Sequence, residues 1–158
     1  MKRIKLDKID RKILKDLQDN GRITNVELSK NAGISAPPCL RRVRALEENG
    51  FIKGYYARLD GAALGYGLSV FAHIQLLSQA ENDLKEFETS CKEIEEIREC
   101  HMLSGEVDFL LRVVAKDWDA YQQFLTEKLT ALNNVKSVKT MPLVRSVKED
   151  SGVPIQID

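Results

Sequence analysis

The sequence has few of the residues that disulfide frameworks and metal sites need. It contains three cysteines, two histidines and one tryptophan in 158 residues. Cys39, Cys91 and Cys100 cannot all pair within one chain, and none lies in a CxxC motif, so neither a disulfide framework nor a zinc ribbon is indicated. Cys100 and His101 are adjacent on a predicted strand, where neighbouring side chains point to opposite faces. We therefore predict that the protein has no metal site and no cofactor. The lack of a disulfide framework also fits a protein of a reducing compartment.

Long apolar runs are also missing. No run approaches the roughly 20 apolar residues of a membrane span, and the N-terminus, Met-Lys-Arg-Ile-Lys-Leu-Asp, lacks the apolar core of a secretory signal. With 43% hydrophobic and 30% charged residues, the composition is that of a globular protein. We expect a cytoplasmic protein with no membrane partner, long enough for two small domains that each bury a core.

The net charge of zero conceals an uneven distribution of charge. Residues 1–60 hold 14 Lys or Arg against 8 Asp or Glu, which gives +6, and residues 61–158 hold 10 against 16, which gives −6. This asymmetry predicts a first half that binds a polyanion and a second half that does not.

The stretch from Ser35 to Gly50 is predicted to be a helix with two unlike faces. Ser35 can cap it, Pro37 and Pro38 suit its first turn, and Gly50 suits the left-handed residue after its end. One side is apolar and holds Ala36, Cys39, Leu40, Val43 and Leu46. The opposite side holds Pro37, Pro38, Arg41, Arg44 and Ala45, with Arg42 at its margin. Alone, such a basic face is more often solvated than functional.

The preceding and following segments favour the functional interpretation. Asp7 is predicted to cap a first helix that ends at Asn20-Gly21, and Thr24-x-x-Glu27 is a capping box that opens a second. The apolar residues of the second helix, expected in the core, are Val26, Leu28 and Ala32. The β-prone segment 51–59, interrupted by Gly54, predicts the two strands of a wing. Residues 1–59 thus form a predicted winged helix-turn-helix domain that binds DNA.

The residues predicted to contact DNA lie at the start and on the outer face of the third helix. Ser35, Pro37 and Pro38 lie at the end that approaches DNA, and Arg41, Arg42 and Arg44 can bind phosphates or pair with guanine. Arg41 is the arginine we expect on a base edge, because it lies at the centre of the face opposite the apolar stripe.

The second half is predicted to be a ferredoxin-like βαββαβ domain, which makes the whole chain an α+β protein. The small, glycine-rich segment 60–67 is a predicted hinge, residues 68–147 form the domain, and residues 148–158 form a tail. The predicted elements are strand 68–77, helix 81–92, strands 97–103 and 107–115, a helix that follows Asp117, and a strand from Val135 to about Val147. The aromatic residues of the last helix, Trp118 included, are expected in the core.

Two helices would cover one face of this sheet, and the other face would stay bare. The strand 107–115 is apolar on both sides, so we expect a second copy of the chain to cover the bare face. A dimer also suits a helix-turn-helix, whose specific binding usually needs two half-sites.

The sequence resembles the leucine-responsive and asparagine-responsive regulators, which form the Lrp/AsnC or feast/famine family. The matching residues are Asp10, Ile13-Leu14, Leu17, Gly21-Arg22, Leu28-Ser29, Gly33-Ile34-Ser35, Cys39, Arg42-Val43, Leu46-Glu47, Gly50-Phe51-Ile52, Ser104-Gly105 and Asp108. Segments 25–30, 39–46 and 95–104 look most like the leucine-responsive branch. The resemblance implies a transcription regulator whose second domain dimerises, assembles into tetramers or octamers, and binds a free amino acid such as leucine.

The resemblance also implies where the amino acid binds, in the loop that holds Ser104, Gly105 and Asp108. Gly105 would let a ligand carboxylate approach backbone N–H groups, and Asp108 could pair with its ammonium group. Without the resemblance, the loop would be interpreted as a simple hairpin turn.

Two other functions remain as alternatives. One is an architectural protein that wraps DNA and has no ligand response. The other is a metabolic enzyme, since ferredoxin-like sheets also serve catalysts. We predict no catalytic residues, because the sequence shows no paired carboxylates, no nucleophile with a base and no phosphate loop.

Overall fold

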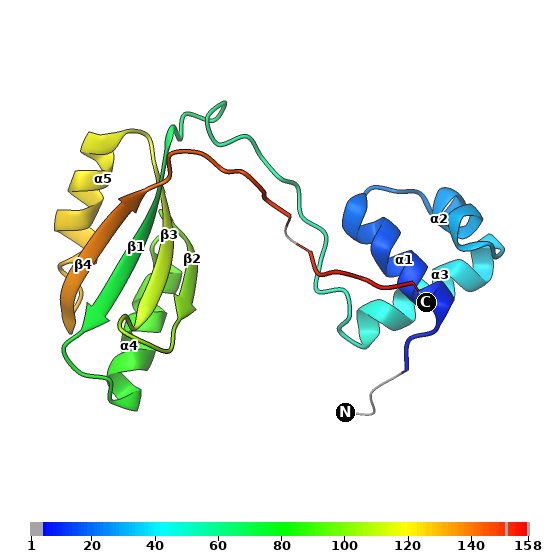
Figure 1. Cartoon of the computed structure of the whole chain (residues 1–158), viewed down its shortest axis with the longest axis horizontal. Coiled ribbons are helices and arrows are strands. Elements are labelled where there is room, and N and C mark those ends of the chain that lie inside the picture. The colour runs from blue at the N-terminus through cyan, green and yellow to red at the C-terminus, as the bar shows by residue number, and fades with distance from the viewer. Residues whose placement is uncertain (1–4, 151, 158) are drawn as a thin grey trace. The chain divides into compact units, whose positions relative to one another are not determined.

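The structure, a computed structural model, describes residues 5–150 and 152–157 (Figure 1). The chain forms two compact units. One comprises the described residues up to Arg58 together with those from Glu149 onward, and the other comprises Leu59–Lys148. The described residues from Glu149 onward therefore belong to the first unit, a placement that the sequence did not predict.

The first unit is a bundle of three short helices, α1 (Lys8–Asp19), α2 (Asn25–Ala32) and α3 (Ala36–Glu48). Complete capping boxes open α1 and α2: Asp7 with Asp10, and Thr24 with Glu27. Each box satisfies backbone N–H groups that otherwise have no acceptor at a helix start. The helices bury a common core, which consists of Ile13, Leu28, Ala32, Cys39 and Leu46.

Details of this unit differ from the prediction at two points. Val26 was expected in the core but is 70% exposed, because it lies in the first turn of α2 about 160° around the helix axis from the buried Leu28. Ser35 occupies the N-cap position of α3, but its side chain makes no capping hydrogen bond. Gly33 and Gly50 have the left-handed backbone, φ 73° at both, that lets α2 and α3 end there.

The two predicted strands of the wing are not formed. Residues 51–59, all of which the structure describes, contain no strand. An isolated two-stranded ribbon is marginally stable without a surface to pack on. Instead the segment is held at its start, where the N–H of Phe51 donates to the carbonyl of Leu46 at 2.9 Å, and at Tyr55, whose hydroxyl donates to Glu47 Oε1 at 2.9 Å.

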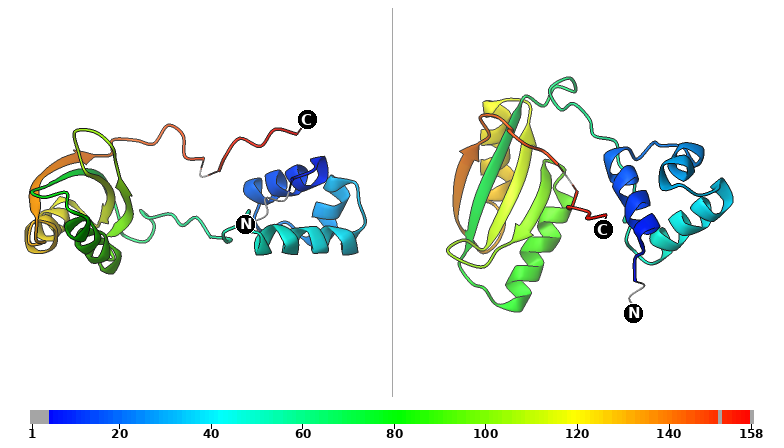
Figure 2. Two further views of the ribbon diagram at one scale, coloured as in Figure 1. Left: turned by 90° about the horizontal axis from the view of Figure 1, so that it is seen from below. Right: turned by 45° about the vertical axis from the view of Figure 1, so that its right-hand side comes forward.

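The second unit is a four-stranded antiparallel sheet with two helices on one face (Figure 2). Its elements are β1 (Leu68–Leu76), α4 (Glu81–Glu93), β2 (Ile97–Met102), β3 (Phe109–Ala115), α5 (Trp118–Phe124) and β4 (Val135–Pro142). The strand order is β2-β3-β1-β4. This arrangement confirms the predicted βαββαβ order and the predicted position of both helices.

The core of this unit lies between the sheet and the helices. Alternate residues of β1 and β3 face it, and the ring of Phe87 on α4 meets that of Phe109 at 4.8 Å between centroids. Tyr121 and Phe124 of α5 are buried as predicted, but Trp118 is 46% exposed because it occupies the first position of α5. After α5 the chain continues as a π-helical turn, Leu125–Leu129, which buries Leu129.

Strands β3 and β4 are shorter than predicted. β3 begins at Phe109 rather than Val107, because Asp108 belongs to the loop, where its carboxylate accepts from the N–H of Leu76 at the end of β1. β4 ends at Pro142, which has no N–H to donate to the neighbouring strand. The N–H of Leu143 donates the last hydrogen bond to the carbonyl of Ser69 at 2.9 Å. Among the described residues, no helix is long and apolar enough to cross a membrane.

Candidate DNA interface and ligand loop

The turn between α2 and α3 is fixed by its caps and by the side chain of Asn25, which no sequence pattern singles out. Gly33 ends α2, and the N–H of Ile34 donates to the carbonyl of Ser29 at 3.0 Å. Asn25, the first residue of α2, donates from Nδ2 to the carbonyl of Ala36 at 3.0 Å. This bond joins the starts of the two helices and sets the direction in which α3 leaves the turn.

The outer face of α3 presents most of the residues predicted to contact DNA. Ser35, Pro37, Arg41 and Arg44 are exposed, and Pro38 is half-buried. The opposite side of the helix is anchored by Cys39 and Leu46, which are 0% and 4% exposed. The helix is therefore held from behind while two guanidinium groups face solvent, as a helix that enters a DNA groove requires.

Arg42 differs from this set, because its guanidinium is engaged within the domain. Its Nη1 lies 2.8 Å from Asp7 Oδ2 and 2.6 Å from Asp10 Oδ1, at the start of α1. Hydrogen bonds to Asp10 and Asp7 raise the pKa of Arg42. The pKa of Asp7 is lowered, first by the backbone N–H of Asp10 and then by Arg42. Arg42 thus joins α3 to α1 in this structure, and its contact with DNA stays a prediction.

The loop between β2 and β3 contains the residues predicted to bind a ligand. Ser104 and Gly105 are exposed, and Gly105 has φ 143°, a backbone conformation that essentially only glycine adopts. Asp108 is half-buried at the end of the loop, where its own N–H donates to the carbonyl of Ile74 at 2.9 Å. Backbone N–H groups at a glycine and a carboxylate thus occur within one short loop.

The carboxylate of Asp108 connects this loop to the end of β1. Its Oδ2 accepts from the N–H of Leu76 at 2.7 Å, and its Oδ1 accepts from Gln79 Nε2 at 2.8 Å. A second bond runs from Gln75 Nε2 to the carbonyl of Glu106 at 2.7 Å. Because each carboxylate oxygen accepts more than one hydrogen bond, Asp108 keeps capacity for an ammonium group. The partners Gln75 and Gln79 lie about 30 positions earlier, so sequence spacing could not reveal them.

Comparison with known proteins decides the family. Residues 6–53 match a family model for a winged helix-turn-helix DNA-binding domain, and residues 69–153 match one for the Lrp/AsnC ligand-binding domain. The chain belongs to the Lrp/AsnC family. It is a DNA-binding transcription regulator with a ligand-binding domain, and not an enzyme. Its βαββαβ unit is the ligand-binding domain of the family.

Relatives of this Lrp/AsnC regulator match over almost the whole chain. The leucine-responsive regulatory protein of Rhizobium meliloti is 52% identical, covering 97% of this chain and 98% of the relative. That of Escherichia coli K12 is 44% identical over 96% of this chain and 92% of the relative. A transcriptional regulator of Neisseria meningitidis, solved in complex with L-Met, has a TM-score of 0.91 at 34% identity, covering 95% of this chain and 97% of that one.

Proposed function

We propose that this regulator reads duplex DNA mainly through Arg41 and Arg44. The observation that carries the proposal is the contrast on α3: these two guanidinium groups are exposed, whereas Arg42 is engaged by Asp7 and Asp10. Ser35 and Pro37 lie exposed at the N-terminus of α3. Because Pro37 and Pro38 have no N–H, the group offered to a phosphate there is the hydroxyl of Ser35, which makes no capping hydrogen bond. Arg41, central on the outer face, pairs with a guanine edge.

Substitution of Arg41 tests this assignment. The affinity of Arg41→Ala is measured by fluorescence anisotropy for an operator duplex and for a matched non-specific duplex. An arginine that reads a base lowers specificity by about 1–3 kcal/mol when removed, because only the operator loses the contact. Lys53→Ala, which removes a charge outside α3, is the matched control. Wild-type discrimination in Arg41→Ala would refute the assignment.

We further propose that the ligand is a free amino acid with an apolar side chain, such as leucine or methionine, bound at Ser104, Gly105 and Asp108. The names of the relatives and the L-Met complex of the Neisseria regulator support this class of ligand. The loop supplies what an amino acid requires: a glycine that admits a carboxylate to backbone N–H groups, and a carboxylate for the ammonium group.

Calorimetry with a panel of free amino acids tests the ligand and its site together. Asp108→Asn should weaken binding by roughly tenfold or more, because a hydrogen bond to a charged group contributes about 1.5–3 kcal/mol. Gln79→Leu is the matched control, since it removes one bond to Asp108 and leaves the charge. Heat released by no amino acid, with no change in assembly, would favour the architectural alternative without a ligand response.

We propose that the open face of the sheet forms a homodimer interface, from which tetramers or octamers assemble in the cytoplasm. In the strand register, the face opposite the helices carries four half-buried apolar side chains: Phe71, Leu110, Val114 and Met141. Arg112 lies between Leu110 and Val114, opposite Phe71, and is paired with Glu99 at 2.6 Å. Apolar side chains around a paired arginine are consistent with a protein interface, where arginine is enriched.

A further inference from the structure

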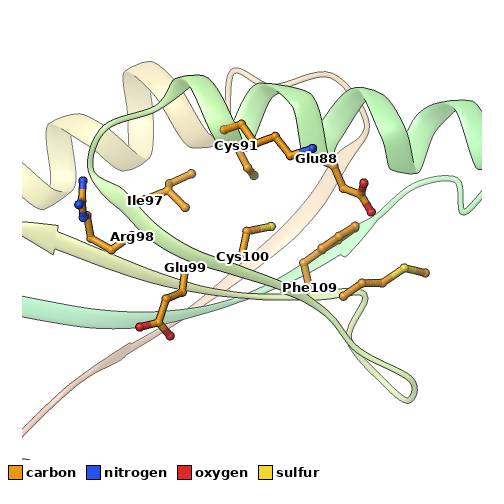
Figure 3. A pocket seen from close by; sticks show the side chains of 9 residues that line it. Glu88, Cys91, Ile97, Arg98, Glu99, Cys100 and Phe109 are labelled. Atoms are coloured by element: carbon orange, nitrogen blue, oxygen red, sulfur yellow. The ribbon is translucent and has the colours of Figure 1, made fainter. Parts of the chain in front are cut away.

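The second unit contains a cavity that the ligand loop does not use. It has a volume of about 380 Å³ and lies between α4 and the edge strand β2. Cys91 of α4 and Cys100 of β2 both line it, and Figure 3 shows their side chains pointing toward one another. Both thiols are free. Cys91 is 3% exposed, whereas Cys100, on the sheet edge, is half-buried and faces α4.

We propose that Cys91 and Cys100 form a peroxide-sensitive dithiol, in which a hydroperoxide that enters the cavity oxidises the pair to a reversible disulfide between α4 and β2. Two thiols of unequal exposure at one cavity match the arrangement of an attacking and a resolving cysteine. Cys100 is the attacking residue, because it is the more accessible of the two.

The chemistry balances with the peroxide as the oxidant. The Cys100 thiolate attacks one peroxide oxygen and becomes a sulfenic acid as the O–O bond breaks. The other oxygen takes up the proton that Cys100 had released and leaves as an alcohol, or as water when the oxidant is hydrogen peroxide. The Cys91 sulfur then attacks the sulfenic sulfur of Cys100, the S–O bond breaks, and water leaves with the proton of Cys91. The two thiols lose two electrons and the peroxide gains them. A reducing thiol reverses the step by exchange.

The surroundings favour thiolate formation at Cys100. A hydrogen bond with Cys91 lowers the pKa of Cys100, and Lys92 acts in the same direction, whereas burial and Glu88 oppose it. The same hydrogen bond raises the pKa of Cys91, as does its burial. Of the two thiols, Cys100 therefore loses its proton more readily than Cys91.

Peptide mapping of the full chain tests the proposal directly. The reduced protein is treated with hydrogen peroxide, denatured in N-ethylmaleimide and digested without reductant. We expect a disulfide between the peptides that contain Cys91 and Cys100, with Cys39 alone alkylated, and full alkylation after a reducing thiol is added. Alkylation of all three cysteines after peroxide, or a disulfide that includes Cys39, would overturn the proposal.

Variants separate the roles of the two thiols. Cys91→Ser should leave a sulfenic acid at Cys100 that dimedone traps, and Cys100→Ser should abolish both the disulfide and the trapped adduct. Cys39→Ala, in the core of the other unit, is the control and should form the disulfide as wild type does. Glu88→Gln should speed the oxidation of Cys100 and Lys92→Gln should slow it. Dimedone trapping at Cys91 but not at Cys100 would contradict the assigned roles.

Discussion

Arg42 differs from Arg41 and Arg44 in that its guanidinium is paired within its own unit. Its side chain is 34% exposed and reaches Asp10, whose side chain is only 13% exposed. Removing the guanidinium would leave a nearly buried carboxylate without its charged partner, which is costly. The position therefore supports the fold, whereas Arg41 and Arg44 remain available to DNA.

We predict that Arg42→Met lowers the free energy of unfolding by about 1–3 kcal/mol, the cost of a buried polar group left unsatisfied. Urea denaturation measures this loss, and a double-mutant cycle with Asp10→Asn assigns it to the pair. DNA affinity per folded molecule should stay at the wild-type level. Unchanged stability with weakened DNA binding would instead make Arg42 a DNA contact.

Glu96 provides a pH-dependent contribution to stability. A hydrogen bond from Lys128 Nζ, 2.6 Å from Glu96 Oε1, lowers the pKa of Glu96 below its usual 4.5. The folded protein then binds fewer protons than the unfolded chain, so this contribution is complete above the unfolded pKa and is lost as pH falls through the folded pKa. Lys128→Met should lower stability at pH 7 by about 1 kcal/mol or less, given the partial exposure of the pair.

Comparison of urea denaturation at pH 7 and in acid checks this expectation. The difference between wild type and Lys128→Met should shrink once Glu96 is protonated in both states. Lys136→Met, on the exposed part of β4, is the control. A difference that stays constant with pH would show that Lys128 acts through packing of its side-chain stem rather than through its charge.

Among the elements, the C-terminal segment from Glu149 onward has contacts that could not be predicted from the sequence. Gln18 on α1 donates from Nε2 to the carbonyl of Val153 at 3.0 Å and accepts from its N–H at 3.0 Å. Arg11 donates to the carbonyl of Gln156 at 3.4 Å, and Arg58 forms an ion pair with Glu149. The segment that follows β4 is thereby attached to the DNA-binding unit, in addition to the connection before β1.

We predict that Gln18→Leu frees this segment without unfolding α1. The amide of Val153 should exchange faster in hydrogen–deuterium exchange, because both bonds to the carboxamide are lost. Amides of the α1 core should exchange at the wild-type rate, because the lost bonds are exposed and contribute little. Asp19→Asn, on the next position of α1, is the control. Unchanged exchange at Val153 would show that Gln18 does not hold the segment.

The elements also show what sequence patterns can and cannot predict. Caps and glycines at Asp7, Thr24, Gly33 and Gly50 are local signals, and each marks a helix boundary that the structure contains. Alternation in β1 likewise identified the core face, whereas β3 is apolar on both sides and its core face could not be read from the pattern. The prediction of two wing strands was wrong, because the β-propensity of residues 51–59 does not show whether a surface is available for the strands to pack on.

The contacts of the site were predictable only in part, for a related reason. The outward position of Arg41 follows from helical periodicity alone. The pairing of Arg42 with Asp10 and of Asp108 with Gln79 joins residues about 30 positions apart, and no spacing rule connects such residues before the fold is known.

At the scale of the whole molecule, the open sheet face is expected to hold two copies together. A lysine at Leu110 would place an unpaired charge at the centre of that face, where burial is costly. We predict that Leu110→Lys converts the dimer to a monomer in sedimentation velocity and weakens operator binding, while Glu127→Lys on the helical side leaves the mass unchanged. A dimer that survives in Leu110→Lys would place the interface elsewhere.

A regulator of this kind requires that the amino acid bind two states of the assembly unequally. The most direct measurement is the mass of the full chain in solution, by sedimentation velocity, with and without leucine. We expect a dimer or a larger assembly without leucine and a different distribution of masses with it. A monomer under both conditions would contradict the proposed interface, and an identical assembly under both conditions would contradict the proposed leucine response.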